Sequence, residues 1–178
     1  NGVSDFLKWC KDNNISMGVC TNKQEYLAVD LLKKIKIYNF FEYVAGSDTF
    51  DYCKPDPRHL TNIVEIMQGD INKCIMIGDS ETDAGTAKAA GVPFILLENG
   101  YTEKKVSEIY HNHLVKDYIG IDKIVNKYLN HWYWLKYIQR VLKIIDMINH
   151  KVKVYPSKIK IHKRKQLAWK IAEIASDK

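Results

Sequence analysis

In the first 125 residues, two patterns of apolar and polar positions alternate, one typical of strands and the other typical of helices. Short apolar runs such as Cys74 to Ile77 have the length of buried strands, and the segments between the runs carry apolar residues at helical spacing. The pattern predicts helices at 3–13, 24–35, 58–68 and 82–90, and strands at 15–20, 43–46, 74–77, 93–97 and near 113–115. Because strands alternate with helices, we predict an α/β fold, a Rossmann-like parallel sheet with helices on both faces.

Beyond the predicted sheet, a different pattern begins. Apolar residues recur every three or four positions from Lys127 to His150 and predict an amphipathic helix with an aromatic first half. Lysines alternate with apolar residues at 151–161 around a Tyr-Pro-Ser turn, which predicts a hairpin, and a last helix is predicted at 164–175. We therefore divide the chain into a core at 1–125 and a mostly helical basic extension at 126–178.

Charge divides the chain at the same place. The extension carries 13 lysines and arginines against three acidic residues, a net charge of +10, whereas the core carries 14 against 18, a net −4. With 46% hydrophobic and 27% charged residues the whole composition is that of an ordinary globular protein, and no stretch has the about 18 apolar residues of a membrane span. Four cysteines without Cys-x-x-Cys spacing favour reduced thiols and a cytoplasmic location.

Two carboxylates follow the apolar run that ends at Ile77. Asp79 and Asp83 are four residues apart, where a predicted strand gives way to a predicted helix. Open α/β sheets place ligands at the carboxyl ends of their strands, and carboxylate oxygens suit Mg²⁺, which completes its shell with water and substrate phosphate. The alternative is an ordinary helix start, in which Asp79 or Ser80 is the N-cap and the acidic residues complement the helix dipole.

Two further stretches carry groups that can bind an anion. Thr21 and Asn22 follow a predicted strand and offer a hydroxyl and backbone N–H groups at the start of a helix. Lys54 lies in a connection that two nearby prolines stiffen, and this limits the conformational entropy that its side chain loses when it points at one anion. Each has an ordinary alternative, with Thr21 as a helix cap and Lys54 as a solvated loop charge.

Taken in order, these stretches resemble the motifs of a known family. Val19 to Lys23, Lys54 to Pro57, and Gly78 to Ala84 with the following Ala89 to Val92 look like the second, third and fourth motifs of haloacid dehalogenase-like phosphatases. The phosphoglycolate phosphatase-like subgroup is the most similar, and the resemblance covers about residues 1–125. It implies Mg²⁺-dependent hydrolysis of a small phosphate monoester, with phosphoglycolate as the expected substrate, through transfer of the phosphoryl group to an aspartate.

The resemblance also implies a role for each candidate residue. Thr21 and the backbone of Asn22 would hold the phosphate, and Lys54 would offset the charge on the phosphate and the nucleophile. Asp79 would bind Mg²⁺, and Asp83 would support either the metal or Lys54. These roles suit phosphoryl transfer, which asks the protein mainly for positioning and charge stabilisation.

One motif of the family is missing from the sequence. An Asp-x-Asp pair on the central strand supplies the nucleophile and the general acid/base in the family, and no such pair occurs here, since Asp51 and Asp56 do not fit it. Residues 3–12 already match the helix before the second motif. We therefore expect an N-terminally truncated protein, with the nucleophile and the substrate-selecting cap upstream of residue 1, and expect the chain to be inactive alone.

A sheet without that central strand has two buried edges. In the family the strand lies between those predicted here at 15–20 and 74–77. Unpaired buried amides are costly, so we predict one of three outcomes. The two strands pair with each other, one arm of the hairpin at 151–161 fills the gap, or the chain is unstable alone.

The basic extension supports a second hypothesis, a non-catalytic phosphate-binding or nucleic-acid-associated protein. Clustered basic residues bind nucleic-acid backbones or anionic lipid, and aromatic rings can stack on bases. The alternative is a solvated lysine face, because Lys, Ile, Asn and Tyr dominate this part of the chain. The candidate residues are Lys158, Lys160, Lys163, Arg164 and Lys165, with Trp132, Tyr133 and Trp134.

Overall fold

The structure, a computed structural model, describes residues 1–100 and 102–151. The chain divides into two units, Asn1–Asn126 and Lys127–Lys178, and all strands and predicted site residues described below belong to the first. The basic cluster at 158–165 and the predicted helix at 164–175 lie outside the described residues, as does the predicted hairpin beyond Lys151.

The first unit alternates strands and helices, which confirms the predicted α/β fold. The helices are α1 (Val3–Asp12), α2 (Glu25–Lys34), α3 (Pro57–Ile66), α4 (Glu81–Ala90) and α5 (Ile121–Lys151), which begins in this unit. The strands are β1 (Gly18–Cys20), β2 (Tyr43–Ala45), β3 (Met76–Gly78), β4 (Phe94–Leu97) and β5 (His113–Val115). Single 3-10 turns lie at η1 (Tyr38–Phe40), η2 (Ile71–Lys73) and η3 (Val106–Glu108).

Local signals explain where α3 and α4 begin and end. The Asp56 side chain is the N-cap of α3 and accepts a hydrogen bond of 2.9 Å from the Arg58 N–H, and Pro57 occupies the first helical position, where its missing N–H costs nothing. Helix α4 ends at Gly91, whose φ of 70° is left-handed and suits glycine. These caps fix the two helices that support the strands nearest the site.

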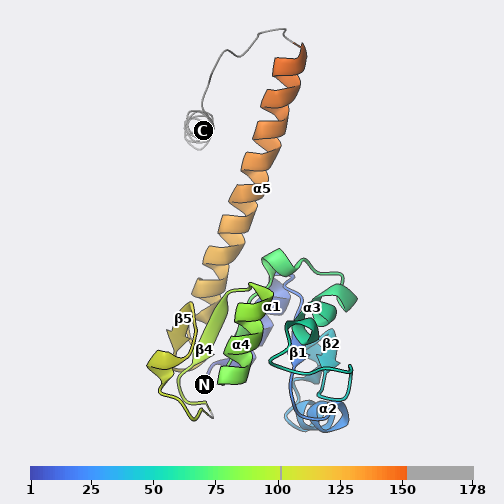
Figure 1. Ribbon diagram of the computed structural model, residues 1–178, viewed down its shortest axis with the longest axis vertical. Coiled ribbons are helices and arrows are strands. Elements are labelled where there is room, and N and C mark those ends of the chain that lie inside the picture. The colour runs from blue at the N-terminus through green and yellow to red at the C-terminus, as the bar shows by residue number, and fades with distance from the viewer. Residues whose placement is uncertain (101, 152–178) are drawn as a thin grey trace. The chain divides into compact units, whose positions relative to one another are not determined.

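All strand pairs are parallel, but the strands form two sheets. β1 pairs with β2, and β3, β4 and β5 pair in that order. No ladder joins β1 to β3 in the described part of the chain, so direct pairing of these two strands, the first of the three outcomes considered above, is not found. In the view of Figure 1 the β1–β2 pair and the β4–β5 pair lie on opposite sides of α4.

Helix packing explains why the two sheets stay apart. α3 packs against α4, and α3 contacts β1 whereas α4 contacts β3. Neighbouring helices pack 8–10 Å apart, which is about twice the 4.8 Å spacing of neighbouring strands. Two strands that are each anchored to one of two neighbouring helices are therefore too far apart to pair.

The main hydrophobic core lies where α3 and α4 cover the strands. Its buried members are Leu60, Met76, Ala84, Ala87, Val92, Phe94, Leu96 and Ile109. Cys20 of β1 and Cys74, which lies just before β3, pack against this core, and burial raises their thiol pKa to about 12 and about 11. All four cysteines are free thiols.

The long helix α5 contains the aromatic segment that the periodicity predicted. It runs for 31 residues and carries Trp132, Tyr133 and Trp134. Among the described helices, none has the length and apolar character needed to cross a membrane.

Candidate functional site

The carboxyl ends of three strands carry the predicted site residues. Thr21 and Asn22 follow β1, Lys54 lies in the loop after β2, and Asp79 follows β3. The Asn22 Nδ2 group donates to the Lys54 carbonyl oxygen at 2.9 Å, and the Lys54 N–H donates to Asn22 Oδ1 at 3.0 Å. This pair of hydrogen bonds fixes the Lys54 backbone to the end of β1.

A buried ion pair joins the β2 loop to the helix that follows β3. The Lys54 Nζ atom lies 2.5 Å from Oδ1 of Asp83, and the two side chains are only 10% and 7% exposed. A charge at this depth needs its partner, because water cannot replace the lost interaction. The pair therefore ties the position of Lys54 to that of α4.

Asp83 also organises the start of α4. Its Oδ2 atom accepts hydrogen bonds from the Asp79 N–H at 3.1 Å, the Ser80 N–H at 3.2 Å and the Ser80 hydroxyl at 2.8 Å. Ser80 is the N-cap, and its Oγ in turn accepts from the Asp83 N–H at 3.2 Å, which completes a capping box. The helix-start alternative thus holds for Ser80 and Asp83.

Asp79 is placed differently from Asp83. Its side chain is exposed, and its carboxylate makes no hydrogen bond or ion pair with any other described residue. The backbone around it is tightly packed, since a Cβ atom on Gly100 would lie 1.9 Å from the Asp79 carbonyl oxygen. Close packing fixes the backbone of Asp79 while its carboxylate stays free to bind a ligand.

These surroundings allow a test of whether Mg²⁺ fits. Asp79 offers one free carboxylate, and Mg²⁺ usually takes one or two protein carboxylates and completes its shell with water and phosphate. Both oxygens of Asp83 already accept hydrogen bonds from protein donors. Among the described residues no three His, Cys, Asp or Glu side chains form a metal cluster. A site with Asp79 as its direct ligand fits this arrangement, and Asp83 would act on it through Lys54 and the Asp79 backbone.

Thr21 and Asn22 lie in the connection between β1 and α2. The Thr21 hydroxyl accepts from the Lys23 N–H at 3.2 Å, and Gln24 rather than Thr21 is the N-cap of α2. The Asn22 N–H has no hydrogen-bond partner within the described residues. A hydroxyl and a free N–H next to Lys54 are groups that can bind phosphate oxygens.

The loop that carries Lys54 is also fastened to α2. The Glu25 N–H donates to Asp48 Oδ1 at 2.8 Å, and the Thr49 hydroxyl donates to Glu25 Oε2 at 2.6 Å. Asp48 thus satisfies the first backbone N–H of α2 from another part of the chain. Gly46 is needed here, because a Cβ atom on it would lie 2.2 Å from the Glu25 nitrogen.

Two residues near the site carry no recognisable signal in the sequence. Burial raises the pKa of the Tyr118 hydroxyl, and the carboxylates of Asp79 and Asp83 raise it further. His59 on α3 is fully buried, and burial together with the Lys54 ammonium lowers its pKa. Only the fold brings these residues to the site, so a single sequence could not identify them.

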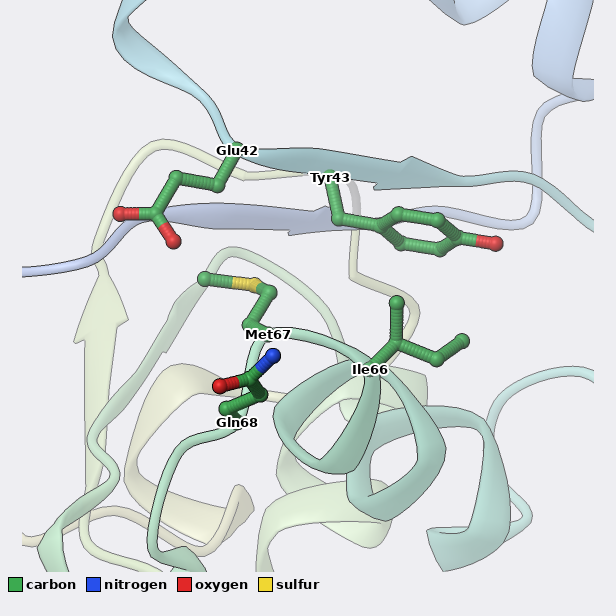
Figure 2. Close-up of a pocket in the computed structure, with 5 residues that line it drawn as sticks. All are labelled: Glu42, Tyr43, Ile66, Met67 and Gln68. Carbon is green, nitrogen blue, oxygen red and sulfur yellow. The ribbon is translucent and has the colours of Figure 1, made fainter.

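A separate hollow lies at the other end of the first sheet. Its volume is about 350 Å³, and it is lined by Glu42, Tyr43, Ile66, Met67 and Gln68. Figure 2 shows these side chains between the start of β2 and the end of α3. The strands begin here, whereas the predicted site residues lie where they end, so the hollow is distinct from the candidate site.

The capping box leads to a first prediction. Replacing Ser80 with alanine removes one donor to Asp83 and the N-cap of α4, and we expect the free energy of unfolding to fall by about 1 kcal/mol. Urea unfolding followed by circular dichroism measures this. Ser107→Ala is the control, because Ser107 is exposed and its side chain makes no hydrogen bond with another described residue. Equal stability of Ser80→Ala and the native protein would contradict the capping role.

Comparison with known proteins gives the sequence relatives of the chain. A family model described as haloacid dehalogenase-like hydrolase matches residues 1–97. The phosphoglycolate phosphatase of Mesorhizobium japonicum is 39% identical over 107 residues, which are 60% of this chain and 47% of that protein. The phosphoglycolate phosphatase of Agrobacterium fabrum is 35% identical over 131 residues, 71% of this chain and 56% of that protein. The chain thus spans about half the length of these curated relatives.

Solved structures share the fold. A predicted phosphoglycolate phosphatase from Haemophilus somnus superposes with a TM-score of 0.66 at 22% sequence identity, covering 69% of this chain and 55% of that one. A HAD-superfamily hydrolase from Ehrlichia chaffeensis gives a TM-score of 0.61 at 22% identity, covering 72% of this chain and 58% of that one. At this level of identity the likeness concerns the arrangement of strands and helices.

Proposed function

The chain belongs to the haloacid dehalogenase-like hydrolase family, and we therefore propose that it forms the phosphate- and cation-binding side of a Mg²⁺-dependent phosphatase site. The substrate class is a small phosphate monoester, with phosphoglycolate as the leading candidate because the curated relatives carry that name. The observation that supports this proposal most is the buried Lys54–Asp83 pair, which lies one hydrogen bond away from both Asn22 and Asp79.

In this proposal the residues after β1 and β2 bind the phosphate. The Thr21 hydroxyl and the Asn22 N–H face the phosphate oxygens, and the Lys54 ammonium offsets the negative charge that builds up during transfer. The Asn22 side chain holds both the N–H and the C=O of Lys54, so the Lys54 ammonium needs little reorganisation. Preorganised charge of this kind accounts for much of the rate enhancement of a phosphatase.

Asp79 is the proposed direct ligand of the cation. When bound there, Mg²⁺ would supply positive charge beside the phosphate. The chain's own contribution is to hold the Asp79 backbone, through the hydrogen bond from its N–H to Asp83 and the close approach of Gly100. Asp83 therefore couples the Lys54 side of the site to the cation side.

The sequence contains no Asp-x-Asp pair to supply an attacking carboxylate. We propose that the 178-residue chain binds phosphate and cation but does not by itself hydrolyse a phosphate ester. An assay with a generic aryl phosphate and Mg²⁺ tests this, and we expect no turnover above that of the buffer. Turnover that disappears in an Asp79→Asn variant would show that the chain carries a nucleophile of its own.

Cation binding gives a more direct test of the proposed site. Replacing Asp79 with asparagine removes the negative charge of the only proposed direct ligand, and we expect the affinity for Mg²⁺ in the presence of phosphate to fall by more than about tenfold. Isothermal titration calorimetry measures it. Asp51→Asn is the matched control, since Asp51 is also exposed and lies near Lys54 in the sequence. Equal weakening by both changes would indicate a general effect of charge.

A further inference from the structure

The segment 132–143 of α5 has an apolar face. At about 100° per residue, four apolar side chains fall within an arc of about 100°, and no polar residue of this segment shares that arc. They are Trp134, Leu135, Ile138 and Leu142. Trp134, Leu135 and Leu142 are 45%, 40% and 37% exposed, so much of this face is in contact with water. Large apolar groups that lie together in solvent favour a partner that covers them.

The opposite face of the same segment is basic. Lys136, Arg140 and Lys143 follow one another at spacings of four and three residues, and all three are exposed. Residues 127–143 contain four lysines and arginines and no aspartate or glutamate. The positive charge of the basic face is therefore not neutralised within this segment, and it suits an anionic partner.

The aromatic residues of α5 combine an apolar body with a polar edge. The rings of His131 and Trp134 stack with their centroids 6.5 Å apart, and the centroids of Tyr128 and Trp132 are 6.0 Å apart. An indole has a large apolar surface and one N–H donor, so it is most favourable where hydrocarbon meets water. These residues therefore favour a partner that is apolar inside and polar at its surface.

We propose that the segment 132–143 of α5 is an interfacial helix that lies on an anionic lipid bilayer. In that position the apolar face enters the boundary between headgroups and acyl chains, about 5–10 Å deep, and the basic face lies among the lipid phosphates. The long aliphatic stems of lysine and arginine let their charges reach those phosphates. The proposal is independent of the phosphatase function, because it involves only a helix segment of the second unit.

Two other partners fit the two faces less well. A second copy of the chain would bring the charges of Lys136 and Lys143 close to the same charges of the other copy, and like charges repel. A nucleic acid strand whose phosphates pair with Lys143 leaves Trp134 on the opposite side of the helix, where it cannot stack on the bases. A bilayer satisfies both faces at the same time.

Sedimentation of the full chain with lipid vesicles tests the basic face. The vesicles contain three parts phosphatidylcholine and one part phosphatidylglycerol, and vesicles of phosphatidylcholine alone are the neutral comparison. We expect the affinity for the anionic vesicles to be at least about tenfold higher. The triple variant Lys136→Gln/Arg140→Gln/Lys143→Gln should lower that affinity at least about tenfold, because each charge contributes to the attraction.

A matched triple variant controls for net charge. Lys33→Gln/Lys34→Gln/Lys36→Gln removes the same charge from three exposed positions on and just after α2. We expect it to change the affinity for the anionic vesicles less than about threefold. Equal losses in the two triple variants, or equal affinity of the native protein for anionic and neutral vesicles, would overturn the proposal.

Tryptophan quenching separates insertion of the apolar face from adsorption by charge alone. We expect anionic vesicles with brominated acyl chains to quench the protein fluorescence, and Trp134→Phe to remove at least about half of that quenching. Trp9→Phe is the control and should remove little of it, because Trp9 lies on α1 and stacks with Phe6 at 6.1 Å. Binding without quenching, or equal quenching in both variants, would overturn the proposal. Stronger binding to single-stranded oligothymidylate than to the vesicles would assign the faces to nucleic acid and also overturn it.

Discussion

Replacing Lys54 with methionine is expected to lower the free energy of unfolding by about 3 kcal/mol. Asp83 is only 7% exposed, and without Lys54 its Oδ1 atom becomes a buried acceptor with no charged partner. Methionine keeps most of the side-chain volume, so the loss of stability measures the effect of the unpaired Asp83 charge and not that of a cavity. Urea unfolding measures it, and the Lys54→Met/Asp83→Asn double variant should recover part of the loss because it removes the unpaired charge.

The chain offers a matched control for this prediction. Lys34 lies 2.6 Å from Asp30 on α2, but these side chains are 72% and 54% exposed. Solvent screens such a pair, so Lys34→Met should change the free energy of unfolding by less than about 0.5 kcal/mol. Similar losses for Lys54→Met and Lys34→Met would contradict the structural importance of the buried pair.

Replacing Gly78 with alanine is expected to cost about 2–3 kcal/mol and to disturb the site. A Cβ atom on Gly78 would lie 2.5 Å from Asp83 Oδ2 and 2.6 Å from Asp83 Cβ, which is too close for either atom to remain in place. Asp83 would have to move, and its hydrogen bonds to Asp79, Ser80 and Lys54 would weaken together. Urea unfolding gives the loss of stability, and the NMR signals of Asp79 and Ser80 report the local change.

Gly85 on α4 is the control for this substitution. A Cβ atom there would meet only the Pro55 side chain, at 3.3 Å, and alanine favours a helix over glycine by about 1 kcal/mol. The two effects oppose each other, so the free energy of unfolding of Gly85→Ala should stay within about 1 kcal/mol of that of the native protein. A Gly78→Ala protein as stable as Gly85→Ala would show that the packing around Asp83 is looser than the structure indicates.

The periodicity of the sequence predicted the order and type of the elements well. Short apolar runs and helical spacing are local properties, so strands such as β3 and β4 could be found without knowledge of their neighbours. Strand pairing is not local. The separation of β1 from β3 depends on how α3 packs against α4, and no single segment of the sequence contains that information.

The sequence suggested the candidate residues, but it could predict only part of how they are connected. Motif order placed Asn22 and Asp79 after predicted strands and Lys54 before a predicted helix, and hydrogen bonds join Asn22 to Lys54 and Asp79 to Asp83. The hydrogen bonds of Asp83 that connect them depend on side-chain direction at the start of α4, which spacing alone leaves open. The metal, phosphate and catalytic roles of these residues remain predictions.

The central claim is that Thr21, Asn22, Lys54 and Asp79 form one pocket for an anion and a cation. A titration of the isotope-labelled protein with inorganic phosphate and Mg²⁺, followed by amide NMR shifts, tests it most directly. We predict saturable shifts concentrated at residues 21–23, 53–54 and 78–83, with little change around the hollow near Met67. Shifts that are absent from these segments, or that centre on the hollow, would contradict the claim.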